Sequence, residues 1–260
     1  MNRPKTPAHV ELKLRQEAGF GCAACGCPIT DYHHIIEWSE KPHFDVADMV
    51  ALCPNHHREF GKRAAKHAYR LKQNPHNLKF GRIKGFLGGN GIQKAIRMGG
   101  MLVKNCNSVL AYSKVPIFSY RMIDGEINLS AFLPNEHFWP EIEVHDNSIS
   151  AILGDFWDIE FKTNWIKFRR AKGDIFLEID FRGENVTIDG NFSIRGQQIT
   201  LSKTKSLIGT NTITNAVIEN CDTAMMLGPN GRLLKPNYAM TTPCAIFLPS
   251  GNIWDPRKLK

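Results

Sequence analysis

The stretch CPNHHREF, residues 53–60, contains two adjacent histidines that follow a cysteine by three and four residues. Cys53 and His56 are separated by two residues, and Cys22 and Cys25 have the same spacing. Thiolate and imidazole both suit tetrahedral Zn²⁺, and two intervening residues allow both members of a pair to turn toward one ion. The spacing therefore predicts a structural zinc site with the ligands Cys22, Cys25, Cys53 and His56, and with Cys27 as the alternative to Cys25.

Three further histidines, His33, His34 and His57, lie close to these pairs in the sequence. Adjacent residues of an ideal strand point to opposite faces, so His33 and His34 can flank one site only at a strand end, a twist or a bulge. On a helix, His56 and His57 point about 100° apart. We therefore expect His56 to face the zinc and His57 to face a second site.

The order of motifs over about residues 10–72 is C-x-x-C-G, then YHHII, then D-x-x-D-M-V-A-L-C-P-N-H-H. This order resembles the HNH endonuclease family in its zinc-stabilised form. The resemblance implies a ββα-metal unit, in which two strands, a loop and a helix enclose one catalytic divalent ion. It also implies an endonuclease that hydrolyses DNA phosphodiester bonds with Mg²⁺ or Mn²⁺ and leaves 5′-phosphate and 3′-hydroxyl ends.

The resemblance also implies roles for individual residues. His34 would be the general base, and His33 and His57 would hold the catalytic ion. Asp48 stands where the family usually has asparagine, so its carboxylate would either accept a hydrogen bond from His34 or lean toward the ion. His56 replaces the usual fourth cysteine. The helix that follows would approach the minor groove and contact phosphates through Arg58, Lys62, Arg63, Lys66 and Arg70.

The charge of the chain is unevenly distributed. The 260 residues carry a net charge of +8, but residues 1–104 hold 17 Lys and Arg against 8 Asp and Glu, whereas residues 105–260 hold 16 against 17. A basic N-terminal region beside a nearly neutral remainder favours a polyanionic partner such as DNA. No apolar run approaches the ~20 residues of a membrane span, and the N-terminus has no apolar signal core. We therefore expect a cytoplasmic protein with no membrane partner.

The hydrophobic periodicity along the chain and the positions of glycine and proline predict an α+β protein. A helix over 8–18, two short strands and a second helix ending before Pro75 form an HNH-like domain at 1–80. A glycine-rich linker follows at 81–105, with a short helix around IQKAIRM. Short alternating strands at roughly ten-residue intervals then predict an all-β domain at 106–260, as a sandwich or roll, with a solenoid as the alternative.

Two other functions are compatible with these motifs. The zinc site would stabilise a basic module that binds nucleic acid without cutting it, with Asp48 as a sign of lost catalysis. Alternatively, a ligand or protein partner of the β-domain would control the nuclease as its effector. The sequence leaves the oligomeric state and the DNA sequence preference open.

Overall fold

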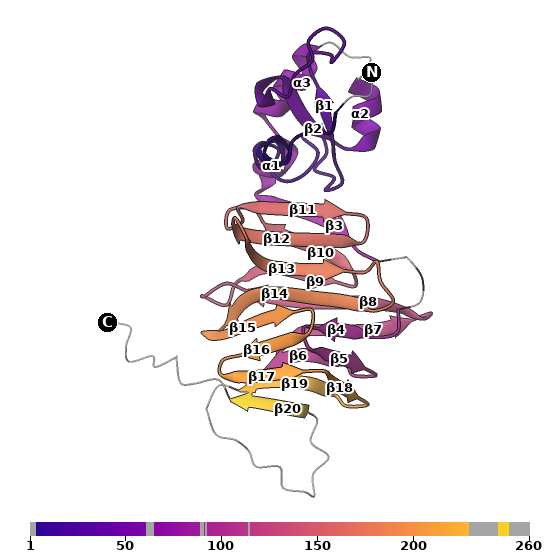
Figure 1. Ribbon diagram of the computed structural model, residues 1–260, viewed down its shortest axis with the longest axis vertical. Helices are drawn as coiled ribbons and strands as arrows, with labels where there is room; N and C mark the ends of the chain where they lie inside the picture. The colour runs from indigo at the N-terminus through magenta and orange to yellow at the C-terminus, as the bar shows by residue number, and fades with distance from the viewer. Residues whose placement is uncertain are drawn as a thin grey trace, which may run out of the picture. The chain divides into compact units, whose positions relative to one another are not determined.

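The chain is mostly β, and its helices lie in the N-terminal part (Figure 1). This agrees with the predicted α+β class and with a β-rich C-terminal part. Within the described residues, no helix is long and apolar enough to cross a membrane. The computed structural model describes residues 4–60, 65–88, 91, 93–113 and 115–228, together with the backbone of 244–249.

The chain divides into two compact units. The first comprises residues 1–85 and 150–173, and the second comprises 86–149 and 174–260. The first unit therefore includes a hairpin from the range 106–260, which the sequence assigns to the β-domain. The chain passes between the units three times, so each unit is built from segments that are distant in the sequence.

A short antiparallel hairpin organises the first unit. β1 (Asp31–His34) pairs with β2 (Met49–Leu52), and all four residues of β2 are buried. The apolar run MVAL favours this fully buried strand, which contacts α1, α2 and α3. The other elements of this unit are α1 (Ala8–Glu17), η1 (Val46–Asp48), α2 (Pro54–Phe60), α3 (Ala65–Gln73), α4 (His76–Phe80), β11 (Asp158–Lys162) and β12 (Trp165–Ala171), while β3 (Arg82–Phe86) and β10 (Ser148–Ile152) each cross a unit boundary.

Three expectations about these elements can be compared with the structure. The helix expected over 8–18 is α1. The helix expected after Cys53 is present as α2 and α3, and the residues between them, 61–64, lie outside the described part of the chain. The predicted linker contains β3, β4 (Ile96–Met98) and β5 (Met101–Lys104). The short helix expected around IQKAIRM is wrong, because β4 pairs in parallel with Val186–Ile188.

A buried ion pair attaches α1 to the β11–β12 hairpin. Arg15 donates from Nε and Nη2 to the two carboxylate oxygens of Asp158, at 2.9 Å each, and the Asp158 side chain is only 3% exposed. Arg169 of β12 donates to the same carboxylate at 3.0 Å. Burial by itself lowers the pKa of the Arg15 guanidinium, but the bonds to Asp158 outweigh it and raise this pKa above its usual value. The Arg15 guanidinium therefore stays charged in this buried position.

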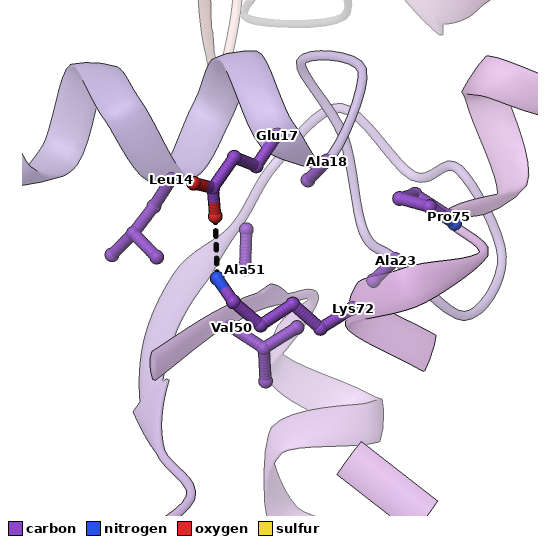
Figure 2. Close-up of a pocket in the computed structure, with 8 residues that line it drawn as sticks. All are labelled: Leu14, Glu17, Ala18, Ala23, Val50, Ala51, Lys72 and Pro75. Atoms are coloured by element: carbon purple, nitrogen blue, oxygen red, sulfur yellow. Dashed lines mark hydrogen bonds and ion pairs between the residues drawn. The ribbon is translucent and has the colours of Figure 1, made fainter. Parts of the chain in front are cut away.

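A second ion pair joins α1 to α3. Lys72 of α3 donates to the carboxylate of Glu17 across a small pocket with mostly apolar walls (Figure 2). The pocket lies where α1, β2 and α3 meet, and the ion pair lies at one side of it. Its lining residues are Leu14, Glu17, Ala18, Ala23, Val50, Ala51, Lys72 and Pro75.

The second unit contains two sheets that pack face to face. Phe118 and Phe192 come from different sheets, and their ring centroids lie 6.1 Å apart in the core. One sheet contains β13 to β17 in sequence order, and the other has the order β20-β19-β6-β7-β8-β9 (Figure 1). The strands are β6 (Ser108–Tyr112), β7 (Val115–Ile123), β8 (Glu126–Pro134), β9 (Pro140–His145), β13 (Asp174–Asp180), β14 (Val186–Ile194), β15 (Gln197–Ser202), β16 (Lys205–Ile208), β17 (Asn211–Thr214), β18 (Ala216–Glu219), β19 (Thr223–Gly228) and β20 (Cys244–Pro249).

The pairing in the second unit is mixed. Hairpins such as β14–β15 are antiparallel, as the regular alternation of the sequence predicts. β5 pairs in parallel with β18, and β6 pairs in parallel with β19. Parallel pairing needs a long connection between the partners, so periodicity in the sequence could not identify these partners.

The buried ion pair predicts a stability defect in one variant. Asp158→Asn should lower the free energy of unfolding by about 3 kcal/mol, because it leaves the Arg15 guanidinium without its carboxylate in a buried site, while Arg169 keeps Glu160. Urea denaturation of the full chain measures this value. The control is Lys94→Ala, which removes a pair with Glu184 that is 67% and 63% exposed and should change stability little. Equal stability of Asp158→Asn and the wild type would contradict this role for Asp158.

Candidate metal centre and adjoining histidine site

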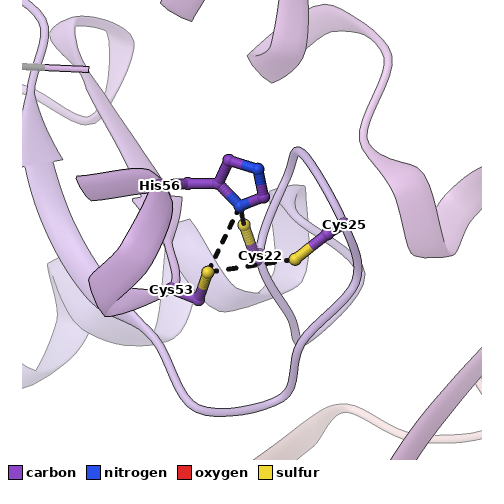
Figure 3. A group of neighbouring side chains, drawn as sticks. All are labelled: Cys22, Cys25, Cys53 and His56. Carbon is purple, nitrogen blue, oxygen red and sulfur yellow. Dashed lines mark hydrogen bonds between the residues drawn. The ribbon is translucent and has the colours of Figure 1, made fainter. Parts of the chain in front are cut away.

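Four side chains from two segments converge at the start of α2. Figure 3 shows the thiols of Cys22, Cys25 and Cys53 pointing toward one another and toward the Nδ1 atom of His56. The ligand atoms all lie within 4.8 Å of one another. The Cys27 thiol lies outside this group and donates to the carbonyl of Ile29. The structure thus brings together the four residues that the paired spacing selects.

The separations within the cluster suit a tetrahedral cation. With Zn–S bonds of about 2.3 Å and Zn–N bonds of about 2.0 Å, a tetrahedron has S–S edges of about 3.8 Å and S–N edges of about 3.5 Å. The Sγ atoms of Cys25 and Cys53 lie 3.9 Å apart. His56 Nδ1 lies 3.5 Å from Cys22 Sγ and 3.3 Å from Cys53 Sγ. The donor set and its dimensions fit a closed site for a metal such as zinc.

The backbone around Cys22 is a tight turn that is held from two sides. The Cys22 N–H donates to the carbonyl of Cys27 at 2.8 Å, and the Gly26 N–H donates to the carbonyl of Cys22 at 2.8 Å. Gly26 has φ +76°, and a Cβ there would lie 2.2 Å from the Oδ1 atom of Asn77. Asn77 of α4 is buried and donates to the carbonyl of Gly26. The sequence analysis missed this role of Asn77, because no local motif connects residue 77 to the turn.

The thiols of the cluster differ in acidity. Burial raises the pKa of the Cys25 thiol to about 12, and the neighbouring Cys22 adds to the rise. Burial acts in the same direction on Cys53, but hydrogen bonds with the backbone and ring of His56 lower its pKa to about 7. A coordinated cation deprotonates thiols outright, so metal binding releases protons and becomes tighter as the pH rises.

The rings of His33 on β1 and His57 on α2 lie side by side. Their ring centroids are 5.2 Å apart with an interplanar angle of 76°. The Nδ1 atom of His57 lies 3.8 Å from the Oδ2 atom of Asp31. Asp31 and His33 are two residues apart on β1, so they share one face of the strand. In the structure, His56 faces the three thiols, and His57 faces His33 and Asp31. The sequence analysis did not consider Asp31.

His34 lies among aromatic side chains. It is 3% exposed, and its ring centroid is 5.5 Å from that of Trp38, 4.9 Å from that of His43 and 6.1 Å from that of Phe44. These three residues belong to the loop between β1 and β2. His33 instead faces His57, so the adjacent pair at the end of β1 has two separate environments.

A backbone carbonyl of the loop determines which ring nitrogen of His34 carries the proton. The Nε2 atom of His34 lies 2.9 Å from the carbonyl oxygen of His43. A carbonyl can only accept, so Nε2 carries the proton and Nδ1 is the atom that can take up another. The sequence analysis offered the Asp48 carboxylate as the acceptor of a hydrogen bond from His34. In the structure, the carbonyl of His43 is the acceptor.

The ring of His43 holds this loop in shape. Its Nε2 donates to the carbonyl of Ile36 at 3.1 Å, and its Nδ1 accepts from the N–H of Asp45 at 3.0 Å. His43 has no motif partner in the sequence and would be expected at the surface, but it is buried. It ties the two sides of the loop together while its own carbonyl contacts His34.

Asp48 has a different partner from either of those proposed from the sequence. Its Oδ1 atom accepts a hydrogen bond of 2.8 Å from the hydroxyl of Tyr69 on α3, and this bond raises the pKa of Tyr69. The ligand atoms of His43, Asp45 and Asp48 also lie within 4.8 Å of one another. Because both ring nitrogens of His43 form hydrogen bonds with the backbone, this second group does not present three ligands to an ion.

Part of the predicted phosphate-binding set lies at the surface. Arg58 on α2 and Lys66 and Arg70 on α3 are exposed. Lys66 and Arg70 are four residues apart and share one face of α3. Lys62 and Arg63 lie outside the described residues.

The four-donor cluster predicts a bound metal. Elemental analysis of the purified chain should find about one equivalent of zinc, and Cys22→Ser should lose it together with much of the stability of the first unit. The matched control is Cys27→Ser, which removes a nearby thiol from outside the cluster and should retain the metal. Full zinc content in Cys22→Ser would show that Cys22 is not a ligand.

The loop geometry predicts one tautomer of His34. Long-range ¹H–¹⁵N spectra of the imidazoles should show His34 protonated at Nε2 in the wild type. His43→Ala should broaden or shift this signal, because the loop loses both hydrogen bonds of the His43 ring. His67→Ala, at an exposed position of α3, should leave it unchanged. A His34 signal from the Nδ1–H tautomer in the wild type would contradict the hydrogen bond to His43.

Comparisons with protein-family models, with curated proteins and with solved structures found no match for this chain. The interpretation of the site therefore depends on its own geometry. That geometry consists of a four-donor cluster, a histidine pair beside it and a third histidine whose tautomer is set by a backbone carbonyl.

Proposed function

We propose that the first unit is an HNH-type endonuclease that hydrolyses DNA phosphodiester bonds with a histidine base and one divalent ion. The observation that carries this proposal is that His33 and His34, although adjacent, have different contacts. His33 lies against His57, and His34 has its Nε2 proton bound to the His43 carbonyl. Adjacent positions at the end of one strand thus provide a ligand for an ion and a base for water.

His34 supplies the base. With Nε2–H donated to the carbonyl of His43, Nδ1 takes a proton from a water molecule, and the resulting hydroxide attacks the phosphorus atom. The P–O bond to the departing 3′-oxygen breaks, and a solvent water molecule protonates that oxygen, which completes a hydrolysis with 5′-phosphate and 3′-hydroxyl products. The carbonyl also stabilises the imidazolium that His34 becomes.

His33 and His57 are the candidate ligands of the catalytic ion. A divalent cation there, Mg²⁺ or Mn²⁺, would stabilise the charge that develops on the leaving oxygen. The Nδ1 atom of His57 faces the Asp31 carboxylate, so the Nε2 atom of His57 is the one suited to bind the ion. Asp31 is itself 53% exposed and lies on the Nδ1 side of the His57 ring, away from the Nε2 atom that would bind the ion.

The four-donor cluster has a supporting role. We assign it a structural zinc, because four protein ligands leave no open position for water or substrate. His56 of the cluster and His57 of the pair are consecutive residues of α2, so a change in the cluster would displace His57, the candidate ligand of the catalytic ion. Zinc therefore positions α2 against β1, and the exposed side chains of Arg58, Lys66 and Arg70 on α2 and α3 provide contacts to phosphates.

A second candidate function is DNA binding without cleavage. It is favoured by Asp48, whose carboxylate is bound to Tyr69 and so takes a structural position where the family usually has asparagine. The basic surface and the zinc site would serve this function equally well. The two functions differ only in whether the phosphodiester bond is broken.

One substitution separates these functions. His34→Ala should lower the rate of divalent-dependent plasmid cleavage by about 10²–10⁴-fold, because a general base contributes that much, while DNA affinity and zinc content stay near those of the wild type. His67→Ala is the matched control, since it removes an exposed histidine from α3 and should cut at the wild-type rate. Binding of DNA with no cleavage by the wild type in Mg²⁺ or Mn²⁺ would favour the binding module instead.

A further inference from the structure

Two segments of the second unit run in parallel with a constant offset of 115 residues. β5 is in register with β18, so that Lys104 pairs with Glu219, and β6 is in register with β19, so that Ser108 pairs with Thr223. The side chains between these strands form rungs with the same offset. Asn105 donates to Asn220 at 3.2 Å, and Asn107 donates to Asp222 at 2.7 Å.

Cys106 and Cys221 form the rung between these two. Their Sγ atoms lie 3.1 Å apart. The Cys106 thiol also donates a hydrogen bond to the carbonyl of Lys104, with a sulfur–oxygen distance of 3.2 Å. Cys106 is buried and Cys221 is half-buried, so reagents in solution reach the pair from the side of Cys221.

Backbone hydrogen bonds hold the segments together on both sides of this rung. The Asn220 N–H donates to the carbonyl of Lys104 at 3.2 Å, and the Ser108 N–H donates to the carbonyl of Asp222 at 2.9 Å. Strands joined in this way lie about 4.8 Å apart, which is within the Cα separations of about 4.4–6.8 Å that disulfides span. The thiols therefore need only small side-chain rotations, not a movement of the backbone, to bond.

We propose that Cys106 and Cys221 are a modification site, a dithiol that forms a reversible intramolecular disulfide with a low-molecular-weight disulfide as oxidant. This site is independent of the nuclease proposal, because both cysteines belong to the second unit. The bond would join segments 101–112 and 216–227 covalently. It would close a loop of 115 residues and so restrict the unfolded chain strongly.

The exchange takes two steps with glutathione disulfide. The Cys221 thiolate attacks one sulfur of the reagent, which forms a mixed disulfide and releases one glutathione thiolate. The Cys106 thiolate then attacks Cys221 Sγ and releases the second glutathione. The protein loses two electrons and two protons, one glutathione disulfide gains the electrons, and the protons pass to the two glutathione thiolates.

The test uses the full-length, zinc-loaded chain with glutathione disulfide. The mass of the intact protein should fall by two hydrogens, and peptide mapping without reduction should join the peptides of Cys106 and Cys221. The unfolding temperature should rise by roughly 5–15 °C, and dithiothreitol should reverse both changes. A disulfide between other cysteines, a persistent glutathione adduct on Cys221 or unreacted thiols would each overturn the proposal.

Serine variants provide the controls. Cys106→Ser and Cys221→Ser replace a thiol by the slightly smaller hydroxyl, so in the reduced state they should melt near the wild type. Neither should lose two hydrogens or gain thermal stability on oxidation. Cys27→Ser removes a thiol of the first unit and should behave as the wild type does. A stability gain that persists in Cys106→Ser would show that the oxidant acts elsewhere.

Discussion

The convergence of Cys22, Cys25, Cys53 and His56 is the constraint on which the candidate site depends. These donors come from a turn before β1, from Cys53 just before α2 and from the first turn of α2, so their cluster holds the two ends of the intervening segment together. That segment contains both strands of the hairpin and the loop that surrounds His34. The hairpin is only four residues long on each side, and a two-stranded hairpin of this kind has little stability of its own.

Hydrogen bonds to backbone atoms orient the rings of His34 and His43. The carbonyl of His43 sets the tautomer of His34, and the ring of His43 shapes the loop that presents this carbonyl. The orientation of His34 therefore does not depend on Asp48, whose carboxylate is bound to Tyr69.

The four-donor cluster alone does not complete the first unit. Arg15 forms a bidentate ion pair with Asp158, and Gln16 donates to the carbonyl of Trp157 at 2.9 Å, so α1 is attached to a hairpin more than 140 residues away in the sequence. Buried charged groups of this type contribute little net stability as a pair but are costly to leave unmatched. They therefore favour one partner for α1 over others, and a fragment that ends near residue 80 would lack that partner.

Short-range patterns were enough to select the four residues of the metal cluster, but not Asp31, His43 or Asn77. Two-residue spacing selected Cys22, Cys25, Cys53 and His56, and helical geometry separated His56 from His57, since both depend on distances of one turn or less. The class of the fold was equally accessible, because alternation and apolar runs repeat locally along the strands.

Long-range partners were not accessible in this way. Asp158 for Arg15, Asn77 for the turn at Gly26, and Cys221 for Cys106 are separated by 143, 51 and 115 residues. The parallel pairing of β5 with β18 is equally remote from any local pattern. Which buried carboxylate meets a guanidinium, or which thiol meets another, depends on how distant segments pack, and no spacing along the chain encodes that choice.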